Sequence, residues 1–217
     1  MADTGGLPAG SALAGQARGG TPRAALAELL AGNRRFVSGQ PVHGHDVTAA
    51  AATASGDQQP YAVVLGCIDS RVPLEAIFDQ TFGAICVIRT GAHVLDRAVL
   101  GSIEYVVEVL GVPLVMVLGH ERCGAVQATV DALCTGRRPQ GQLAHLVDRI
   151  APAVAEVGVD DPHVLPAAIR RHVARTVATL RADPRLVPPI TAGRVAVAGA
   201  LYDLATGEVA LLDPPAR

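Results

Sequence analysis

Residues 114–118 read LVMVL, a short apolar run rich in valine, and three further runs of this kind stand elsewhere in the chain. Short, continuous apolar runs with many β-branched residues are typical of strands buried on both faces of a parallel sheet. Strands that alternate with helical patterns predict a right-handed α/β sheet. The other runs are YAVVL at 61–65, AICVI at 84–88 and RVAVAGA at 194–200.

Helical patterns fill the stretches between these runs, and the C-terminal residues follow a different pattern. Residues 201–212 contain two short strand-like segments around Thr206-Gly207, which predicts a hairpin. We therefore expect a mostly parallel sheet, four parallel strands plus an antiparallel C-terminal edge strand, flanked by helices. Apolar residues recur with helical spacing over residues 99–110, 126–133, 143–154 and 169–180.

The N-terminal part divides into two regions. Thr21-Pro22 predicts the start of a first helix that ends near Gly39 and opens an N-terminal helical arm. Residues 1–20 contain few large apolar side chains, so they cannot bury enough surface to offset the entropy lost on ordering. We expect a disordered tail there, followed by a single domain of residues 21–217.

The composition excludes several classes of partner. The 217 residues include 18 Lys and Arg against 20 Asp and Glu, a formal net charge of -2, so neither nucleic acid nor an anionic membrane surface is indicated. No apolar run approaches the roughly 18 residues of a membrane helix, and no secretory signal pattern precedes the first helix. We therefore expect a cytoplasmic protein with a small-molecule partner.

The four cysteines are too sparse for a disulfide framework, so metal binding or catalysis is the better interpretation. Cys67 and Cys123 stand within motifs, whereas Cys86 lies in an apolar run and Cys134 near the end of a helical pattern. We expect these last two to be buried, inert thiols, because free cysteine packs as a small hydrophobic residue.

Two motifs follow two of the predicted strands. GCIDSR comes directly after the first apolar run, and GHERCGA comes directly after the third. Open α/β sheets place their ligands at the carboxyl ends of parallel strands. Zinc prefers thiolate and imidazole ligands in a tetrahedron, and catalytic zinc sites keep three protein ligands with a fourth position open. Cys67, His120 and Cys123 are therefore candidate zinc ligands, and Asp69 is placed to close or open the fourth position.

Each motif alone has a simpler explanation. A His-x-x-Cys pair occurs by chance, and a cysteine after a buried strand often serves only packing. Asp69 with Arg71 is, in isolation, more often a surface ion pair that contributes little to stability. Both motifs together at neighbouring strand ends, with the Cys-x-Asp-x-Arg spacing, favour a functional site.

From about Thr21 to its end the chain resembles the β-class carbonic anhydrases. The resemblance rests on GCIDSRVPLE and on LGSIEYVVEVLGVPLVMVLGHERCGAV. Cys-x-Asp-Ser-Arg followed at this distance by His-x-x-Cys-Gly is highly specific to that family. It implies a parallel core with an antiparallel edge strand and a catalytic Zn²⁺ held by Cys67, His120 and Cys123. It also implies a homodimer or homotetramer with active sites at the dimer interface.

The same resemblance implies roles for further residues. Asp69 and Arg71 correspond to the family's catalytic dyad. Gln58, Tyr105 and Gly124 correspond to substrate-binding positions, with Gln58 as a hydrogen-bonding residue and Tyr105 as part of the pocket wall. The implied reaction is the reversible hydration of carbon dioxide to bicarbonate and a proton through zinc-bound hydroxide, from which Asp69 accepts a hydrogen bond.

One segment departs from the family pattern. Arg89 stands where the family has the arginine of an Arg-x-Ala-Gly-Asn-like segment, but this chain reads RTGAH. Gly91 and Ala92 are thus in exchanged order, and His93 comes last. Cys86 stands where some relatives carry a bulky pocket residue. His93 has two interpretations, a proton relay near the pocket or a structural hydrogen-bonding residue.

Several alternatives stay open from the sequence. Asp69 could instead bind zinc as a fourth ligand in a closed resting state, although Gln58 and the lack of a tryptophan shortly before Cys67 favour an open site. A related zinc hydrolase of carbonyl sulfide or carbon disulfide would share the metal site. The other classes are a non-catalytic closed zinc module and a redox protein that uses Cys67 and Cys123 as a dithiol.

Overall fold

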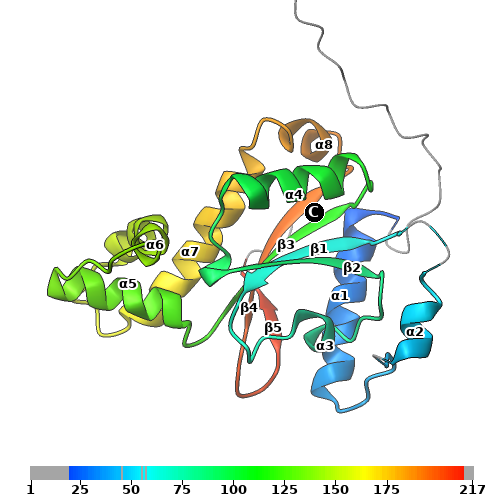
Figure 1. Cartoon of the computed structure of the whole chain (residues 1–217), viewed down its shortest axis with the longest axis horizontal. Coiled ribbons are helices and arrows are strands. Elements are labelled where there is room, and N and C mark those ends of the chain that lie inside the picture. The colour runs from blue at the N-terminus through cyan, green and yellow to red at the C-terminus, as the bar shows by residue number, and fades with distance from the viewer. Residues whose placement is uncertain (1–19, 45, 55, 57, 213–217) are drawn as a thin grey trace, which may run out of the picture.

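The computed structural model of the chain describes residues 20–44, 46–54, 56 and 58–212. The tail predicted at residues 1–20 therefore lies outside the described residues, except for its last residue. The described part contains one mostly parallel sheet with helices on both faces (Figure 1). No helix in this part is long and apolar enough to cross a membrane.

Five strands form the sheet in the order β2-β1-β3-β4-β5, and the first four in this order are parallel. β5 runs antiparallel to β4 at the edge, so the predicted α/β fold with an antiparallel C-terminal edge strand is confirmed. The strands are β1 Ala62–Cys67, β2 Ile85–Thr90, β3 Leu114–His120, β4 Ala196–Tyr202 and β5 Val209–Leu211.

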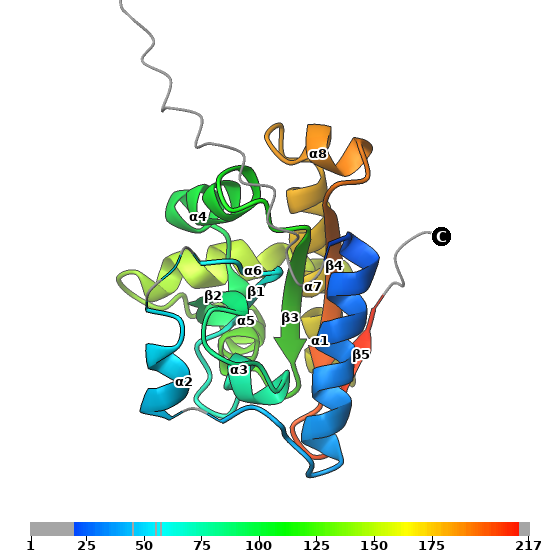
Figure 2. The ribbon, with the colours of Figure 1, turned by 90° about the vertical axis from the view of Figure 1, so that its right-hand side faces the viewer.

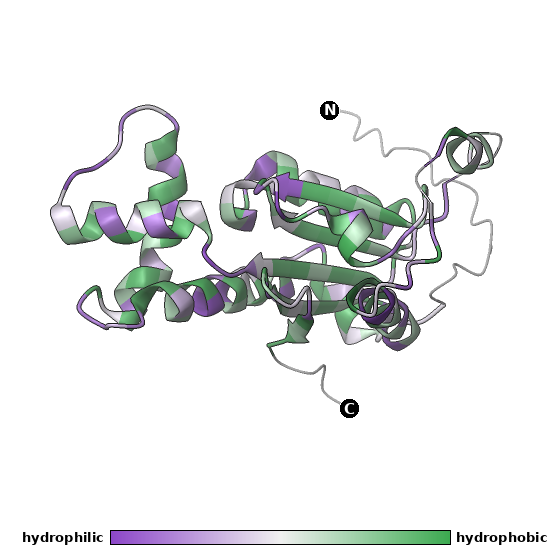
Figure 3. Cartoon of the chain, turned by 90° about the horizontal axis from the view of Figure 1, so that it is seen from below, coloured by the Kyte–Doolittle hydropathy of each residue, from purple (hydrophilic) through white to green (hydrophobic). Residues whose placement is uncertain are grey.

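The central strands are buried on both sides because apolar residues occupy both of their faces. Every residue of β1 and β3 is buried, and Figure 3 shows the strands as largely hydrophobic. Alternate residues of β3 enter separate cores, with Met116 and Leu118 on one face and Val115 and Val117 on the other. This arrangement is the one that continuous apolar runs predict for the middle of a parallel sheet.

Helices cover the two faces of the sheet (Figure 2). α1 Pro22–Val37 and α3 Leu74–Ile77 pack on one face, whereas α4 Arg97–Glu108 and α7 Val164–Arg181 pack on the other. The long helices match the predicted helical patterns. The short helices α3 and α8 escaped prediction because four or five residues make little more than one turn. The remaining helices are α2 Val47–Ala51, α5 Gly124–Thr135, α6 Leu143–Val157, α8 Val187–Thr191 and the 3-10 helix η1 Gly91–His93.

The N-terminal arm is fixed to the rest of the chain by side-chain hydrogen bonds. Thr21 caps α1 by accepting a hydrogen bond from the backbone N–H of Ala24 at 3.2 Å, as the sequence predicts. After α1, the buried carboxylate of Asp79 accepts hydrogen bonds from the backbone N–H groups of Val42 at 3.1 Å and His43 at 3.0 Å. The arm is therefore held against the end of α3 before it continues to α2.

Gly32 marks a very close approach of α1 to the neighbouring backbone. A Cβ atom added there would lie 1.8 Å from the carbonyl oxygen of Phe78, just after α3. Gly32→Ala is therefore expected to lower the free energy of unfolding by about 2 to 3 kcal/mol, because overpacking forces the helix to shift. Urea unfolding of the variant and the wild type measures this difference.

Gly101→Ala is the matched control for this substitution. Gly101 is exposed within α4, and nothing lies within 4 Å of a Cβ atom added there. This variant is expected to equal the wild type or to gain up to about 1 kcal/mol, because alanine is the better helix former. A Gly32→Ala variant as stable as the wild type would contradict the tight contact with Phe78.

Candidate metal centre

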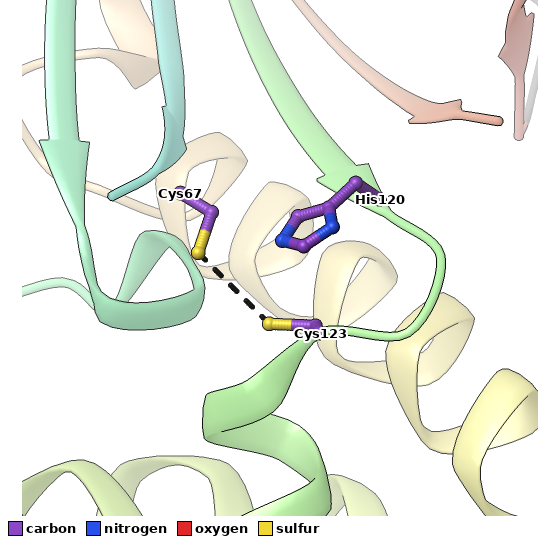
Figure 4. A group of neighbouring side chains, drawn as sticks. All are labelled: Cys67, His120 and Cys123. Carbon is purple, nitrogen blue, oxygen red and sulfur yellow. Dashed lines mark hydrogen bonds between the residues drawn. The ribbon is translucent and has the colours of Figure 1, made fainter. Parts of the chain in front are cut away.

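Two neighbouring strands bring the motif residues to one edge of the sheet. Cys67 ends β1, His120 ends β3, and these strands pair in parallel. Cys123 follows on the turn after β3, at the N-terminus of α5. The Sγ atoms of Cys67 and Cys123 are 3.9 Å apart, and the three ligand atoms lie within 4.8 Å of one another (Figure 4). All three side chains are buried.

The ring of His120 is oriented for ligation. Its Nδ1 lies 2.8 Å from the carbonyl oxygen of Glu121, which can only accept, so Nδ1 carries the hydrogen. Nε2 therefore presents a lone pair, and it is buried without a hydrogen-bond partner in the part of the chain that the structure describes. Figure 4 shows this ring turned toward the two sulfur atoms. A buried, unsatisfied nitrogen is costly unless a ligand completes it.

The two thiols share a hydrogen bond that separates their pKa values. The hydrogen bond from Cys123 lowers the pKa of Cys67 to about 4, and the backbone N–H of Ala92 acts in the same direction. The same hydrogen bond raises the pKa of Cys123, and burial adds to this effect. Metal ligands must be deprotonated, so a bound divalent cation would hold both sulfur atoms as thiolates and release the proton that the pair shares.

These donors fit a zinc ion. Two sulfur atoms that are each about 2.3 Å from one tetrahedral zinc lie about 3.8 Å apart, close to the separation of Cys67 and Cys123. Thiolate and imidazole donors together select zinc over the hard cations magnesium and calcium. Three protein ligands are the number typical of catalytic zinc sites, which leave one position for water or substrate.

A carboxylate held by an arginine lies beside the cluster. Arg71 donates hydrogen bonds to Asp69 from Nε at 2.9 Å, from Nη2 at 2.7 Å and from its backbone N–H at 3.0 Å. These bonds hold the pKa of Asp69 well below its usual range. Oδ2 of Asp69 is 3.9 Å from Nε2 of His120, so the carboxylate faces the cluster. The pair is thus placed at the site and is not an isolated surface ion pair.

Arg89 fixes the backbone of the loop that carries Cys67 and Asp69. Its Nε donates to the carbonyl oxygen of Cys67 at 2.8 Å, and its Nη2 donates to that of Asp69 at 2.6 Å. Arg89 lies near the end of β2, which pairs with β1. The planar guanidinium therefore ties the ends of the two strands together.

The three substrate positions implied by the family are not gathered in one place. Gly124 begins α5 directly after Cys123, and open space lies where its side chain would be. Gln58 is exposed and precedes β1, so the whole strand separates it from Cys67. Tyr105 is 52% exposed in the C-terminal half of α4. Among the residues that the structure describes, no hydrogen bond joins Gln58 or Tyr105 to the cluster.

Comparison with known proteins agrees with this geometry. Residues 62–209 match the family model described as carbonic anhydrase. The chain is 44% identical over 193 residues to carbonic anhydrase 2 of Mycobacterium tuberculosis. The aligned region covers 88% of this chain and 93% of that protein. The chain belongs to the carbonic anhydrase family. This membership confirms the expectation that it is an enzyme.

Solved β-carbonic anhydrases share the fold of this chain. The Coccomyxa β-carbonic anhydrase in complex with acetazolamide aligns with a TM-score of 0.68 at 23% identity and covers 86% of each chain. A structure from the report on two tetrameric β-carbonic anhydrases of Sordaria macrospora aligns with a TM-score of 0.69 at 21% identity, covering 87% of this chain and 97% of that one. The family model, the relative from Mycobacterium tuberculosis and this shared fold together confirm the resemblance to the β-carbonic anhydrases.

The expectation of two buried, inert cysteines outside the cluster is wrong for Cys134. This residue is exposed, because the last turn of α5 faces solvent, and the neighbouring Leu133 is also 40% exposed. Cys86 is partly buried in the edge strand β2, and burial raises the pKa of its thiol. Neither cysteine belongs to the cluster of Cys67 and Cys123.

The family segment that contains the exchanged Gly91 and Ala92 has a structural explanation. A Cβ atom at Gly91 would lie 2.7 Å from Cδ1 of Leu146 in α6. Ala92 instead adopts the left-handed conformation, with φ 49 and ψ 43, which is unfavourable for residues other than glycine. The chain therefore keeps glycine where α6 packs closely and has a strained alanine at the next position.

His172 of α7 is buried, as His93 and His120 are, and the sequence did not indicate this. His93 is 3% exposed, and its ring stacks on that of His172 with the ring centroids 4.6 Å apart. Nε2 of His172 is 2.9 Å from the carbonyl oxygen of Ala92, 80 residues away in the sequence. Such burial favours the structural interpretation of His93 over that of a proton relay.

His172 is expected to make stability depend on pH. Burial lowers the pKa of His172 from 6.5 to about 4. Between these values the unfolded chain binds a proton at this residue and the folded chain does not, so the free energy of unfolding decreases as the pH falls from 6.5 to 4. The contribution of His172 in metal-free protein is about 1.4 kcal/mol per pH unit.

His172→Gln should remove this part of the pH dependence. His145→Gln, at an exposed position of α6, is the control and should leave it unchanged. Urea unfolding of the metal-free proteins at several pH values between 4 and 6.5 compares the slopes. Equal slopes for the wild type and His172→Gln would mean that folding does not lower the pKa of His172.

Proposed function

We propose that the chain catalyses the reversible hydration of carbon dioxide to bicarbonate and a proton, with Zn²⁺ bound by Cys67, His120 and Cys123. The observation that supports this best is the buried cluster of two sulfur atoms and an unpartnered imidazole nitrogen beside the carboxylate of Asp69. Zinc in such a site supplies a Lewis acid that lowers the pKa of water from about 15.7 to about 7.

Asp69 is proposed to orient the water that attacks the carbon of carbon dioxide. Arg71 donates to both carboxylate oxygens and holds the pKa of Asp69 low, so the group is ionised and can only accept hydrogen bonds. A carboxylate in this state fixes the hydrogen of the water and directs an oxygen lone pair toward the substrate. Arg71 is the positioning residue that keeps Asp69 in this state.

Gly124 is proposed to leave room for the substrate beside Cys123. Its missing side chain opens space next to the cluster, which suits a small uncharged molecule. The backbone N–H groups of the first turn of α5 also begin here, and a helix N-terminus favours the negative charge that develops as bicarbonate forms.

Gln58 and Tyr105 are proposed to act on the substrate from a second copy of the chain. The 6 residues of β1 span about 20 Å, and Gln58 lies four residues before the strand begins, at the end of the strand opposite to Cys67. Tyr105 is exposed and free to face a neighbouring molecule. We therefore propose a homodimer or homotetramer, and the tetrameric β-carbonic anhydrases of Sordaria macrospora, which share the fold, support it.

An open fourth position is proposed for the resting site near neutral pH. Arg71 donates a hydrogen bond to each oxygen of Asp69 and fixes the carboxylate, which supports its role as an acceptor for water over that of a metal ligand. The closed state, with Asp69 as the fourth ligand, is the alternative. The open and closed sites share two sulfur ligands and differ in the source of the oxygen ligand. X-ray absorption of the metal-loaded protein tests whether this oxygen belongs to water or to the carboxylate of Asp69.

Metal content and turnover test the proposed function. The purified protein is expected to hold one zinc per chain and to accelerate carbon dioxide hydration in a stopped-flow indicator assay, with a rate that rises toward alkaline pH. Stoichiometric zinc without hydration would contradict the activity, and turnover of carbonyl sulfide or carbon disulfide would then identify the substrate. Protein that stays free of zinc in zinc-containing buffer would contradict the metal centre itself.

A further inference from the structure

A buried pair of histidines lies next to the candidate metal centre and takes no part in the proposed reaction. His93 and His172 are 3% and 5% exposed, and their rings are stacked. His172 belongs to α7, whereas His93 ends η1, the turn between β2 and α4. The pair therefore joins a long helix to the turn that contacts Cys67.

The η1 turn has a backbone conformation that its own residues disfavour. Ala92 has φ 49 and His93 has φ 47, both in the left-handed region that side chains with a Cβ atom rarely adopt. Two contacts from α7 hold this turn. Nε2 of His172 donates to the carbonyl oxygen of Ala92 at 2.9 Å, and the hydroxyl of Thr176 lies 3.4 Å from Nδ1 of His93.

Ala92 connects His172 to a candidate metal ligand. Its carbonyl oxygen accepts the hydrogen bond from His172, and its backbone N–H donates to Sγ of Cys67 at 3.4 Å. An N–H donor stabilises a thiolate and restricts the direction of its remaining lone pairs. A shift of the turn would therefore change both the charge stabilisation and the orientation of Cys67.

We propose that His172 is a positioning residue of the metal centre, whose hydrogen bond to Ala92 holds the Ala92 N–H on the Cys67 sulfur and thereby sets the affinity of the cluster for its metal. This inference rests on the proposed zinc centre, because Cys67 is one of its ligands. His172 itself touches neither metal nor substrate. Its effect passes through the backbone of a single residue.

The cost of burying His172 supports this role. Nδ1 of His172 is buried and has no hydrogen-bond partner among the described residues. An apolar side chain of similar size would avoid burying an unsatisfied Nδ1, but it would leave the carbonyl oxygen of Ala92 without this donor. The hydrogen bond to Ala92 is therefore what histidine supplies at this position and an apolar residue does not.

Four variants separate this role from general packing. His172→Phe and His172→Leu both remove the donor, and the first keeps a ring that can stack on His93. His172→Gln keeps an N–H that can reach Ala92. Val177→Ala is the control, because Val177 is a buried residue of α7 in the apolar core and weakening its packing leaves the turn intact.

Zinc affinity, the cobalt spectrum and the stability of metal-free protein are measured for each variant. Competition with a chromophoric chelator should show zinc binding about 10- to 100-fold weaker in His172→Phe and His172→Leu, and near the wild-type value in His172→Gln. The thiolate-to-cobalt charge-transfer band of Co²⁺-loaded protein should shift in the first two variants alone. Val177→Ala should be less stable in urea yet bind zinc as the wild type does.

If His172→Phe or His172→Leu folds and binds zinc as tightly as the wild type, the inference is overturned. An equal loss of affinity in Val177→Ala would also overturn it, because the loss would then come from a looser α7. Failure of His172→Gln to bind more tightly than His172→Phe would show that the donor is irrelevant. A wild-type protein that binds no zinc would instead overturn the proposed function, and the two failures are therefore distinct.

Discussion

Replacement of Cys123 by serine is expected to abolish zinc binding and to reduce carbon dioxide hydration to the uncatalysed rate. A serine hydroxyl does not ionise near neutral pH, so the cluster loses a thiolate and its charge. Cys67 and His120 would remain, and two protein ligands are fewer than catalytic zinc sites use. Without the Lewis acid the pKa of water returns to about 15.7, and the nucleophile is lost at neutral pH.

Cys134→Ser is the matched control, because it makes the same substitution at an exposed cysteine outside the cluster. It should leave zinc content and hydration rate unchanged. Metal analysis and stopped-flow hydration give both quantities for each protein. Added zinc should raise the melting temperature of the wild type and of Cys134→Ser but not that of Cys123→Ser. Full zinc content in Cys123→Ser would remove Cys123 from the ligand set.

The second large effect is expected for Asp69→Asn, which should keep its zinc and lose about 10²-fold or more in kcat. An amide carries no charge, and it can donate as well as accept, so it no longer fixes the hydrogen of the attacking water. Arg71 loses its partner, but its side chain is 50% exposed and water can solvate it. The fold should therefore survive the substitution.

The pH profile of this variant is informative because Asp69 does not titrate in the neutral range. Arg71 holds the pKa of Asp69 well below its usual range, so the carboxylate is ionised wherever hydration is measured. The rise of the wild-type rate with pH must then come from another group. Asp69→Asn should show a lower plateau with the same midpoint.

Asp131→Asn is the control for this second prediction. Asp131 is a residue of α5 whose carboxylate accepts a hydrogen bond from Gln127 at 2.8 Å on an exposed surface. The control should retain the full rate. Full turnover in Asp69→Asn would contradict the role of Asp69 as an orienting residue. Loss of zinc in that variant would identify Asp69 as a metal ligand of a closed site.

The sheet could be predicted from the sequence because short, continuous apolar runs are typical of strands that are buried on both faces. The runs nevertheless ended two residues before the strands did. Gly66 and Gly119 interrupt the apolar pattern, yet both lie within strands, where an added Cβ atom would come within 2.9 Å of Leu74 and 2.5 Å of Val173, respectively. These glycines allow close packing on the strand, and a pattern of hydrophobicity alone cannot show that.

The convergence of Cys67, His120 and Cys123 could also be predicted, because parallel strands end at the same edge of the sheet. The role of His172 could not. Helical periodicity identifies the buried face of α7, but it does not reveal which polar residue on that face finds a partner 80 residues away. The sequence also does not show whether Gln58 acts at the metal centre of its own chain or at that of a second copy, because this depends on how the copies assemble.

The positions of the proposed ligands determine when a newly made chain can take up its metal. Cys67 and Cys123 are 56 residues apart, with β2 and α4 between them. In a zinc finger, ligands close together in sequence let the ion drive folding. Here β1 and β3 must pair before the ligand atoms come close together, so the chain has to fold before it binds zinc. Zinc supply would then govern how much of the enzyme is active rather than how much is folded.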